Sequence, residues 1–384
     1  TFGYFAVCVI VGHLAGANGR LGLIGCGMYL AGRILYLPLY AAGIPWLRSF
    51  SWNIATLGIV LVGVQALPLA AAETNGTVIC DAVWHDNARN RDMPVRIRLP
   101  TTGARVPVVL FSHGLGGSVA AGTRWAADWT SAGFAVIHLQ HPGSDTSVWE
   151  ALPQPQRIAA LKAAVNAQQM VARLQDVNFA VDTVIAHGKF GDCDLARLDS
   201  RRIGLAGHSM GAGTVLAAAG QRYQVGTELR SFPDRRIRAF IAFSPSAPPI
   251  ARAATPGEDL TAAAMAFDHI TAPLLSVTGT RDTSPIDPSL TPLSRQLVFR
   301  ALPKGNAYLL VLDGADHIVL GGGNGEGAAL RQTTSADDAG IERVVGQVTT
   351  LFWLATLSDS ALALKTLKDL PARALRPGDK WSVR

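Results

Sequence analysis

Residues 207–211, with the sequence Gly-His-Ser-Met-Gly, constrain the fold of this chain more than any other stretch. They follow the largely apolar run 202–206 and precede the small-residue stretch 212–219, which predicts a buried strand, a tight turn and a helix. A serine at such a turn takes a strained backbone conformation, and the flanking glycines leave room where strand and helix nearly touch. The pattern predicts that Ser209 is presented as a nucleophile, with a chance Gly/Ser turn as the alternative.

A serine hydroxyl is a weak nucleophile, so it needs a histidine base and a carboxylate that orients the base. Two later apolar runs, each typical of a buried strand, lead into Asp282 and His317. All three side chains would then lie just beyond the carboxyl ends of strands. Asp313 and Asp316 are rival acids, but both lie on the loop of the histidine, where a turn or helix-cap role is more common. Asp282 is therefore the expected acid.

A glycine-rich loop, residues 111–118, follows an earlier apolar run and reads Phe-Ser-His-Gly-Leu-Gly-Gly-Ser. Acyl transfer builds negative charge on a carbonyl oxygen, which two backbone N–H groups can stabilise, one after the nucleophile and one from such a loop. We expect Leu115 and Met210 to supply this oxyanion hole. A phosphate cradle is the alternative for the loop, but the lysine of a P-loop is missing.

Three further side chains are candidate substrate-binding residues: those of His113, His141 and Trp149. They lie in the glycine-rich loop or in the loop that begins at residue 140, so they would line the same end of the sheet. Ordinary packing is the alternative for each, and His113 is expected to fix its loop rather than act as a second base. The stretch 245–271 is expected to cover the site as an insertion.

Strand and helix patterns alternate from residue 77 onward. The first two strands look like an antiparallel pair, the next two are wholly apolar, and helical patterns occupy 121–132 and 157–187. This alternation predicts an α/β protein of the α/β-hydrolase fold, with a mostly parallel central sheet flanked by helices, because the chain order Ser, Asp, His is the order in that fold. The first four strands are expected at 77–84, 94–100, 106–111 and 134–139.

Four segments of this region resemble the bacterial dienelactone-hydrolase-like group related to the plasma-type platelet-activating-factor acetylhydrolases. The resemblance covers about residues 77–370 and implies hydrolysis of a small-molecule or lipid-like carboxylic ester by a serine triad without a cofactor. A lipase, polyesterase or amidase on the same fold is the alternative. The segments are 111–117, 140–145, 207–213 and 315–317.

Residues 1–72 contain almost no charged side chains. The apolar stretches 21–44 and 53–72 are each long enough to cross a hydrocarbon core of about 30 Å, so they predict two membrane helices. A long signal sequence that ends in the alanines 70–72 is the alternative. Both interpretations place the catalytic domain, 73–384, outside the inner membrane, in the periplasm or extracellular space, either tethered or released.

Residues 31–48 resemble the third helix and following loop of the MAPEG family, membrane-associated proteins in eicosanoid and glutathione metabolism. The resemblance covers about the first 70 residues and corresponds to the second half of a family member. The family segment that carries an Arg/Asn/Glu set is absent from it, so we expect a membrane anchor rather than glutathione chemistry. The alternative is a MAPEG-type membrane protein with an incidental hydrolase part.

The charged residues and cysteines exclude other classes of partner. The net charge of +6 is scattered, without a basic stripe interleaved with aromatics, so no nucleic-acid partner is expected. The four cysteines lack metal-binding spacing, and we predict neither a metal nor a cofactor. Cys80 and Cys193 could form a disulfide if this part is exported, while Cys8 and Cys26 are expected to be small buried apolar residues.

Overall fold

The computed structural model describes residues 20–70, 76–186, 188–247, 261–284, 286–323, 337–370 and 374–384. The chain divides into two compact units, Thr1–Asn75 and Gly76–Arg384. Much of the predicted insertion, 248–260, lies outside the described residues, and so do Cys8 and positions 71–72 of the alternative cleavage site.

The described part of the first unit, residues 20–70, forms two helices, α2 (Arg20–Ala41) and α3 (Pro45–Ala70). The chain turns between them at Gly43, whose φ of +68° favours glycine, and Pro45 is preorganised for the first position of a helix. The helices pack closely, because a Cβ at Gly32 would lie 2.6 Å from the Ser51 carbonyl oxygen. Side chains larger than glycine at this contact would separate the two helices.

Among the described residues, one helix is long and apolar enough to cross a membrane, namely α2 over Leu23–Ala41. The predicted span 21–44 corresponds to α2, which ends at Ala41, before the turn at Gly43. The second predicted span, 53–72, falls in α3 as far as Ala70, and its passage through a membrane stays a prediction.

The second unit is built on a nine-stranded sheet with the order β1-β2-β4-β3-β7-β10-β11-β12-β13. The strands from β4 to β12 run parallel, whereas β2 is antiparallel to both of its neighbours and β13 is antiparallel to β12. This arrangement is the predicted α/β-hydrolase fold. The strands are β1 (Thr77–Asp86), β2 (Arg91–Pro100), β3 (Val106–Ser112), β4 (Ala135–Leu139), β7 (Leu198–His208), β10 (Ile237–Phe243), β11 (Leu274–Arg281), β12 (Ala307–Asp316) and β13 (Lys380–Val383).

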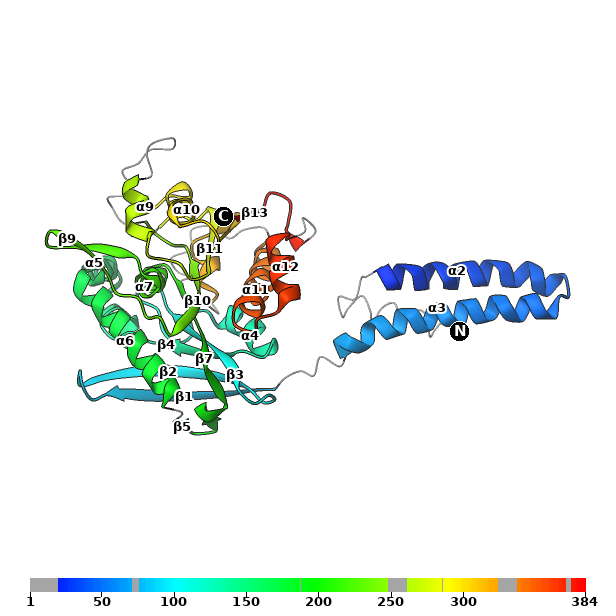
Figure 1. The fold of residues 1–384 in the computed structure, drawn as a ribbon, viewed down its shortest axis with the longest axis horizontal. Helices are drawn as coiled ribbons and strands as arrows, with labels where there is room; N and C mark the ends of the chain where they lie inside the picture. Colours follow the sequence, from blue (N-terminus) through cyan, green and yellow to red (C-terminus); the bar gives the residue numbers. More distant parts are fainter. Residues whose placement is uncertain are drawn as a thin grey trace. The chain divides into compact units, whose positions relative to one another are not determined.

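Helices cover both faces of the sheet (Figure 1). One face packs against α6, α7, α9 and α10, and the other against α4, α11 and α12. Among the described residues of this unit, the α-helices are α4 (Thr123–Ser131), α5 (Gln154–Ala164), α6 (Ala167–Ile185), α7 (Met210–Ala219), α9 (Thr261–Phe267), α10 (Pro292–Ala301), α11 (Asp338–Thr356) and α12 (Ala361–Lys368). Two short antiparallel strand pairs lie outside the main sheet. They are β5 (Lys189–Phe190) with β6 (Cys193–Asp194), and β8 (Arg222–Val225) with β9 (Glu228–Ser231).

The predicted helical stretch 157–187 is two helices rather than one. Helix α5 ends at Ala164, and α6 starts at Ala167 after Asn166, whose side chain accepts a hydrogen bond from the Gln169 amide. An asparagine in this role satisfies an otherwise unpaired N–H at a helix start, and so favours a new helix here over continuation of the old one.

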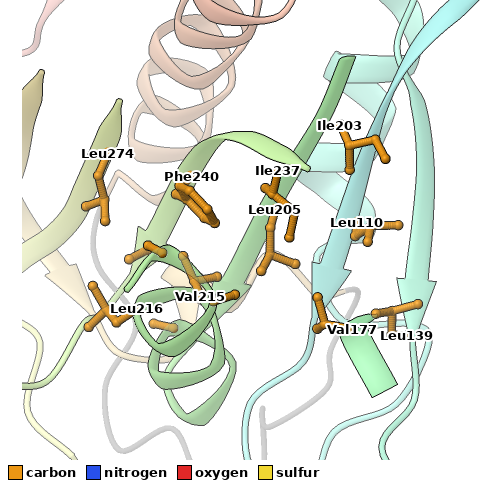
Figure 2. Close-up of a cluster of buried hydrophobic side chains, with 14 of the residues drawn as sticks. Leu110, Leu139, Val177, Ile203, Leu205, Val215, Leu216, Ile237, Phe240 and Leu274 are labelled. Carbon is orange, nitrogen blue, oxygen red and sulfur yellow. The ribbon is translucent and has the colours of Figure 1, made fainter. Parts of the chain in front are cut away.

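The core between the sheet and helices α6 and α7 is formed by side chains of the central strands (Figure 2). Leu110, Leu205 and Phe240 come from three parallel strands and pack with Val177 of α6 and Leu216 of α7. All seven residues of β3 are buried. Strands that are covered on both faces read as continuous apolar runs, which is why their positions could be predicted from the sequence.

A disulfide joins Cys80 on β1 to Cys193 on β6, with 6.1 Å between the Cα atoms and a sequence separation of 113. Cys26 is a free cysteine and is half-buried in the first unit. The disulfide fastens the outer strand of the sheet to the segment that leads into β7.

Loss of the disulfide should destabilise the second unit. Because the crosslink closes a long loop, replacing Cys80 by serine should lower the free energy of unfolding by about 2–5 kcal/mol. Thermal unfolding of the detergent-solubilised full chain, followed by tryptophan fluorescence, measures this change, with Cys26→Ser as the control. A Cys80→Ser melting temperature equal to that of the wild type would contradict the prediction.

Candidate active site

Ser209 lies on the sharp turn between β7 and α7, with φ +55° and ψ −113°. These angles are unfavourable for a residue other than glycine, and such strain is often found at functional turns. The turn is closed by glycines, because a Cβ at Gly211 would lie 2.0 Å from the Ser112 carbonyl oxygen and one at Gly207 would lie 2.5 Å from the Gly211 oxygen. The structure thus places a half-buried serine directly before a helix N-terminus.

The structure brings His317 and Asp282 to this serine. The distance from His317 Nε2 to Ser209 Oγ is 3.0 Å, and that from His317 Nδ1 to Asp282 Oδ1 is 2.8 Å. Asp282 follows β11 and His317 follows β12, so two neighbouring parallel strands deliver them to the same edge of the sheet. An ionised carboxylate only accepts hydrogen bonds, so Nδ1 donates to Asp282 and Nε2 is free to accept from the serine hydroxyl.

Asp282 has no exposed surface and is held by two further donors. Thr278 Oγ1 donates to Oδ2 over 2.8 Å, and Arg295 Nε lies 2.8 Å from Oδ1. Burial raises the pKa of this carboxyl, but the His317 hydrogen bond and the charge of Arg295 outweigh it, so the pKa lies below its usual value. Asp282 is therefore ionised at neutral pH.

Arg295 is a site residue that the sequence analysis did not identify. It lies on α10, is 1% exposed, and donates to the Ser244 carbonyl oxygen over 2.6 Å while its Nη2 lies 3.1 Å from His317 Nδ1. In the sequence it is one of 34 basic residues, with no motif around it. Only the packing of α10 against β11 shows that it neutralises Asp282.

The two rival acids take other roles. Asp316 Oδ1 accepts hydrogen bonds from the amides of Ile318 and Val319, and the exposed Asp313 accepts one from Thr280 Oγ1. Such bonds are typical of carboxylates that stabilise turns. The His317 ring donates its Nδ1–H to Asp282 instead.

His208, the residue before the serine, supports His317 from the side. Its ring lies 4.6 Å from the His317 ring, and its Nε2 donates to the His317 carbonyl oxygen over 2.9 Å. Burial lowers the pKa of His208 well below its usual value, and the adjacent His317 adds to this effect. His208 is therefore neutral and fixes the backbone that carries His317.

The glycine-rich loop lies against the serine. A Cβ at Gly114 would be 3.5 Å from Ser209 Cβ, an ordinary contact distance. The amides of Leu115 and Met210 belong to half-buried residues, and within the described residues neither donates a hydrogen bond to another protein group. They are available to an oxygen atom bound beside Ser209, and their use as an oxyanion hole stays a prediction.

His113 and His141, which were expected to bind substrate, have no exposed surface. His113 Nδ1 donates to the Gly114 carbonyl oxygen over 2.5 Å, and His141 bridges Ser112 Oγ at 2.9 Å and Asp176 Oδ2 at 3.0 Å. Burial and the nearby Arg173 lower the pKa of His141 to about 4. Both rings are neutral and hydrogen-bonded inside the protein, and their contact with substrate stays a prediction.

Trp149 is half-buried, and its Nε1 donates to the Gly116 carbonyl oxygen over 2.8 Å. The Arg157 guanidinium covers its ring at 5.2 Å. The side chain therefore fastens the glycine-rich loop, and its contact with substrate stays a prediction. Across the described residues, no group of three or more His, Cys, Asp or Glu side chains is arranged to hold a metal ion.

Comparisons with known proteins give one family match and a set of similar solved structures. The MAPEG family matches residues 1–68. A comparison with curated protein sequences finds no match. Solved structures similar to the chain include a novel cold-adapted esterase from an Arctic intertidal metagenomic library, in a PEG-bound complex (17% identity, TM-score 0.41) and in native form (17%, 0.40). Each alignment covers 63% of this chain and 86% of the other.

Replacing Arg295 should destabilise the fold strongly. Arg295→Met leaves the Asp282 carboxylate buried without its cation, which should cost about 3 kcal/mol of unfolding free energy near neutral pH. The lowered Asp282 pKa stabilises the fold above the unfolded value of about 3.9, and this contribution is lost as the pH falls through the folded value. The difference in unfolding free energy between the wild type and Arg295→Met should therefore become smaller at acid pH.

Urea unfolding of both proteins between pH 3 and pH 7 measures this pH dependence. Arg300→Met, an exposed arginine on the same helix, is the matched control and should stay within about 0.5 kcal/mol of the wild type. An Arg295→Met deficit that is small at pH 7, or equal at all pH values, would contradict the role assigned to the ion pair.

Proposed function

We propose that this protein is a serine hydrolase that cleaves carboxylic esters through an acyl-enzyme on Ser209. The observation that carries the proposal is the hydrogen-bonded chain from Ser209 through His317 to Asp282, with the serine on a strained turn between a strand and a helix. This is the arrangement in which a weak hydroxyl nucleophile becomes reactive.

The proposed reaction has two halves. Ser209 Oγ attacks the ester carbonyl carbon while His317 Nε2 takes its proton, and the electron pair of the carbonyl moves onto the oxygen. The Leu115 and Met210 amides stabilise that oxygen, and Asp282 stabilises the imidazolium without being protonated. As the carbon–oxygen bond to the alcohol breaks, His317 returns the proton to the leaving alcohol. Water then attacks the acyl-enzyme in the same way and frees the acid.

The proposed substrate class is a small-molecule or lipid-like ester, with no cofactor, as the resemblance to the dienelactone-hydrolase-like and platelet-activating-factor acetylhydrolase-like group implies. Lipase, polyesterase and amidase activities use the same groups and remain the alternatives. Rates on p-nitrophenyl esters of increasing acyl length separate these possibilities, because a site for short acyl groups loses activity as the chain lengthens.

The N-terminal unit suggests a second candidate function. The MAPEG match and the apolar helix α2 support a proposed membrane association through residues 1–72, with 73–384 as the catalytic domain. The disulfide between Cys80 and Cys193 supports an exported location, because such bonds persist in oxidising compartments. If the chain instead works as a MAPEG-type protein, its activity should depend on glutathione, which ester hydrolysis does not require.

Removing the proposed nucleophile is the direct test of the function. Ser209→Ala should lower kcat on p-nitrophenyl butyrate by about 10⁴-fold or more, as expected when a member of a cooperating triad is lost. A fluorophosphonate probe should label Ser209 in the wild type, as peptide mass spectrometry can show. Ser131→Ala, an exposed serine on α4, is the control. Normal turnover by Ser209→Ala would exclude the mechanism.

The identity of the acid can be tested with three matched variants. Asp282→Asn should lower kcat by about 10⁴-fold, because the amide favours the wrong histidine tautomer. Asp313→Asn and Asp316→Asn change the carboxylates on the His317 loop by the same substitution, and should cost far less. If Asp313 or Asp316 is the sensitive position in the steady-state assay, the assignment of Asp282 is wrong.

A further inference from the structure

The glycine-rich loop beside Ser209 is held from behind by a buried arginine. Arg173 lies on α6 and has no exposed surface. Its Nη1 donates to the His113 carbonyl oxygen over 2.7 Å, its Nε to Ser144 Oγ over 2.8 Å, and its Nη2 to the Gly114 carbonyl oxygen over 3.4 Å. The guanidinium therefore contacts two successive carbonyl groups of the loop.

Within the part of the chain that the structure describes, Arg173 forms no ion pair. It donates to carbonyl and hydroxyl oxygens, and its Nη2 also lies 3.4 Å from His113 Nδ1. Burial lowers the pKa of this guanidinium to about 9, although Asp176 and Asp145 counteract the shift. A buried cation without a directly bonded carboxylate is costly, and an apolar side chain would fill the same space more cheaply. Its position is better explained by the loop that it holds than by stability.

The hydrogen bonds of His113 determine which of its nitrogens carries the proton. Its Nε2 accepts from the His141 amide over 3.0 Å, so Nδ1 carries the proton and donates to the Gly114 carbonyl oxygen. Burial lowers the pKa of His113 well below its usual value, and Arg173 lowers it further, so the ring stays neutral. The Gly117 amide also donates to the Gly114 oxygen, over 3.2 Å.

Three donors thus fix one carbonyl oxygen, and peptide geometry transfers the constraint to the next amide. The described chain contains no cis peptide bonds, so the Leu115 N–H points away from the Gly114 oxygen, and hence away from Arg173 and the His113 ring. A Cβ at Gly114 would lie 3.2 Å from His208 Nδ1 and 3.5 Å from Ser209 Cβ, so this part of the loop passes close to the turn that carries the serine. Fixing the oxygen therefore fixes the direction of the N–H.

We propose that Arg173 is a positioning residue, which together with His113 locks the peptide bond between Gly114 and Leu115 so that the Leu115 N–H faces the developing oxyanion at Ser209. The inference rests on the ester hydrolysis proposed above. In this proposal, Arg173 and His113 contribute to catalysis because they preorganise the Leu115 N–H. Without them, the direction of this N–H would change whenever the loop moves.

The test measures kcat and KM separately on p-nitrophenyl butyrate. Arg173→Met should lower kcat by roughly 10²-fold, the effect of losing one oxyanion donor, with KM within about twofold of the wild type. Phenylboronic acid forms a tetrahedral anionic adduct with the serine. Its inhibition constant should therefore rise by a similar factor in Arg173→Met. Arg173→Lys keeps the charge but spans fewer carbonyl groups, so it should recover part of the lost kcat.

Arg89→Met is the matched control. Arg89 bonds to Asp176 in the same cluster, over 2.8 Å, without contacting the glycine-rich loop, so its loss should lower stability and leave kcat within about twofold. If neither Arg173 variant folds, Ser144→Ala removes only the partner of Nε and should still lower kcat, by several-fold, at constant KM.

The outcomes separate the two proposals. An unchanged kcat in the folded Arg173 variants, a loss confined to KM, or an equal kcat loss in Arg89→Met would overturn the positioning role while wild-type turnover and fluorophosphonate labelling of Ser209 still supported the hydrolase. If Ser144→Ala is the only variant that folds, an unchanged kcat overturns the role as well. A wild-type protein that neither hydrolyses the ester nor labels at Ser209 would overturn the proposed function itself.

Discussion

The candidate site depends on one close backbone contact, between the first turn of α7 and the ends of β3 and β7. Side chains are excluded there, since a Cβ at Gly211 would lie 2.0 Å from the Ser112 oxygen. Ser112 belongs to the glycine-rich loop that carries Leu115, so the same contact brings this loop against the turn of Ser209. Nucleophile, helix N-terminus and loop are therefore placed by a single constraint.

Two buried arginines support the site from different sides and by different physical means. Arg295 balances the Asp282 carboxylate, so its charge is compensated directly by an ion pair. Arg173 is surrounded by carbonyl and hydroxyl oxygens and acts on backbone geometry. Arg295 keeps Asp282 ionised, and Arg173 fixes the direction of the Leu115 N–H dipole. Both effects gain strength in an interior from which water is excluded.

Local sequence was least informative where long-range packing decides the role of a side chain. In the sequence, His113 lies in the glycine-rich loop and His141 in the loop that begins at residue 140, so both rings look available to a ligand. In the structure, α6 places Arg173 and Asp176 against them, and both rings are buried. Similarly, nothing in the tail of the chain indicated strand β13, which pairs with β12 at the edge of the sheet. A short edge strand carries little pattern of its own, because only pairing with its neighbour defines it.

The α/β architecture and the three side chains that meet at the sheet edge could be predicted from the amino-acid sequence. Both follow from local rules: buried parallel strands are continuous apolar runs, a Gly-x-Ser-x-Gly turn needs its glycines, and residues that end parallel strands share one edge. The packed fold was needed to show that Arg295 neutralises Asp282, that Arg173 holds the loop, and that the candidate pair Cys80 and Cys193 is bonded. These pairs join residues of different elements, and their energies exist only once the chain is packed.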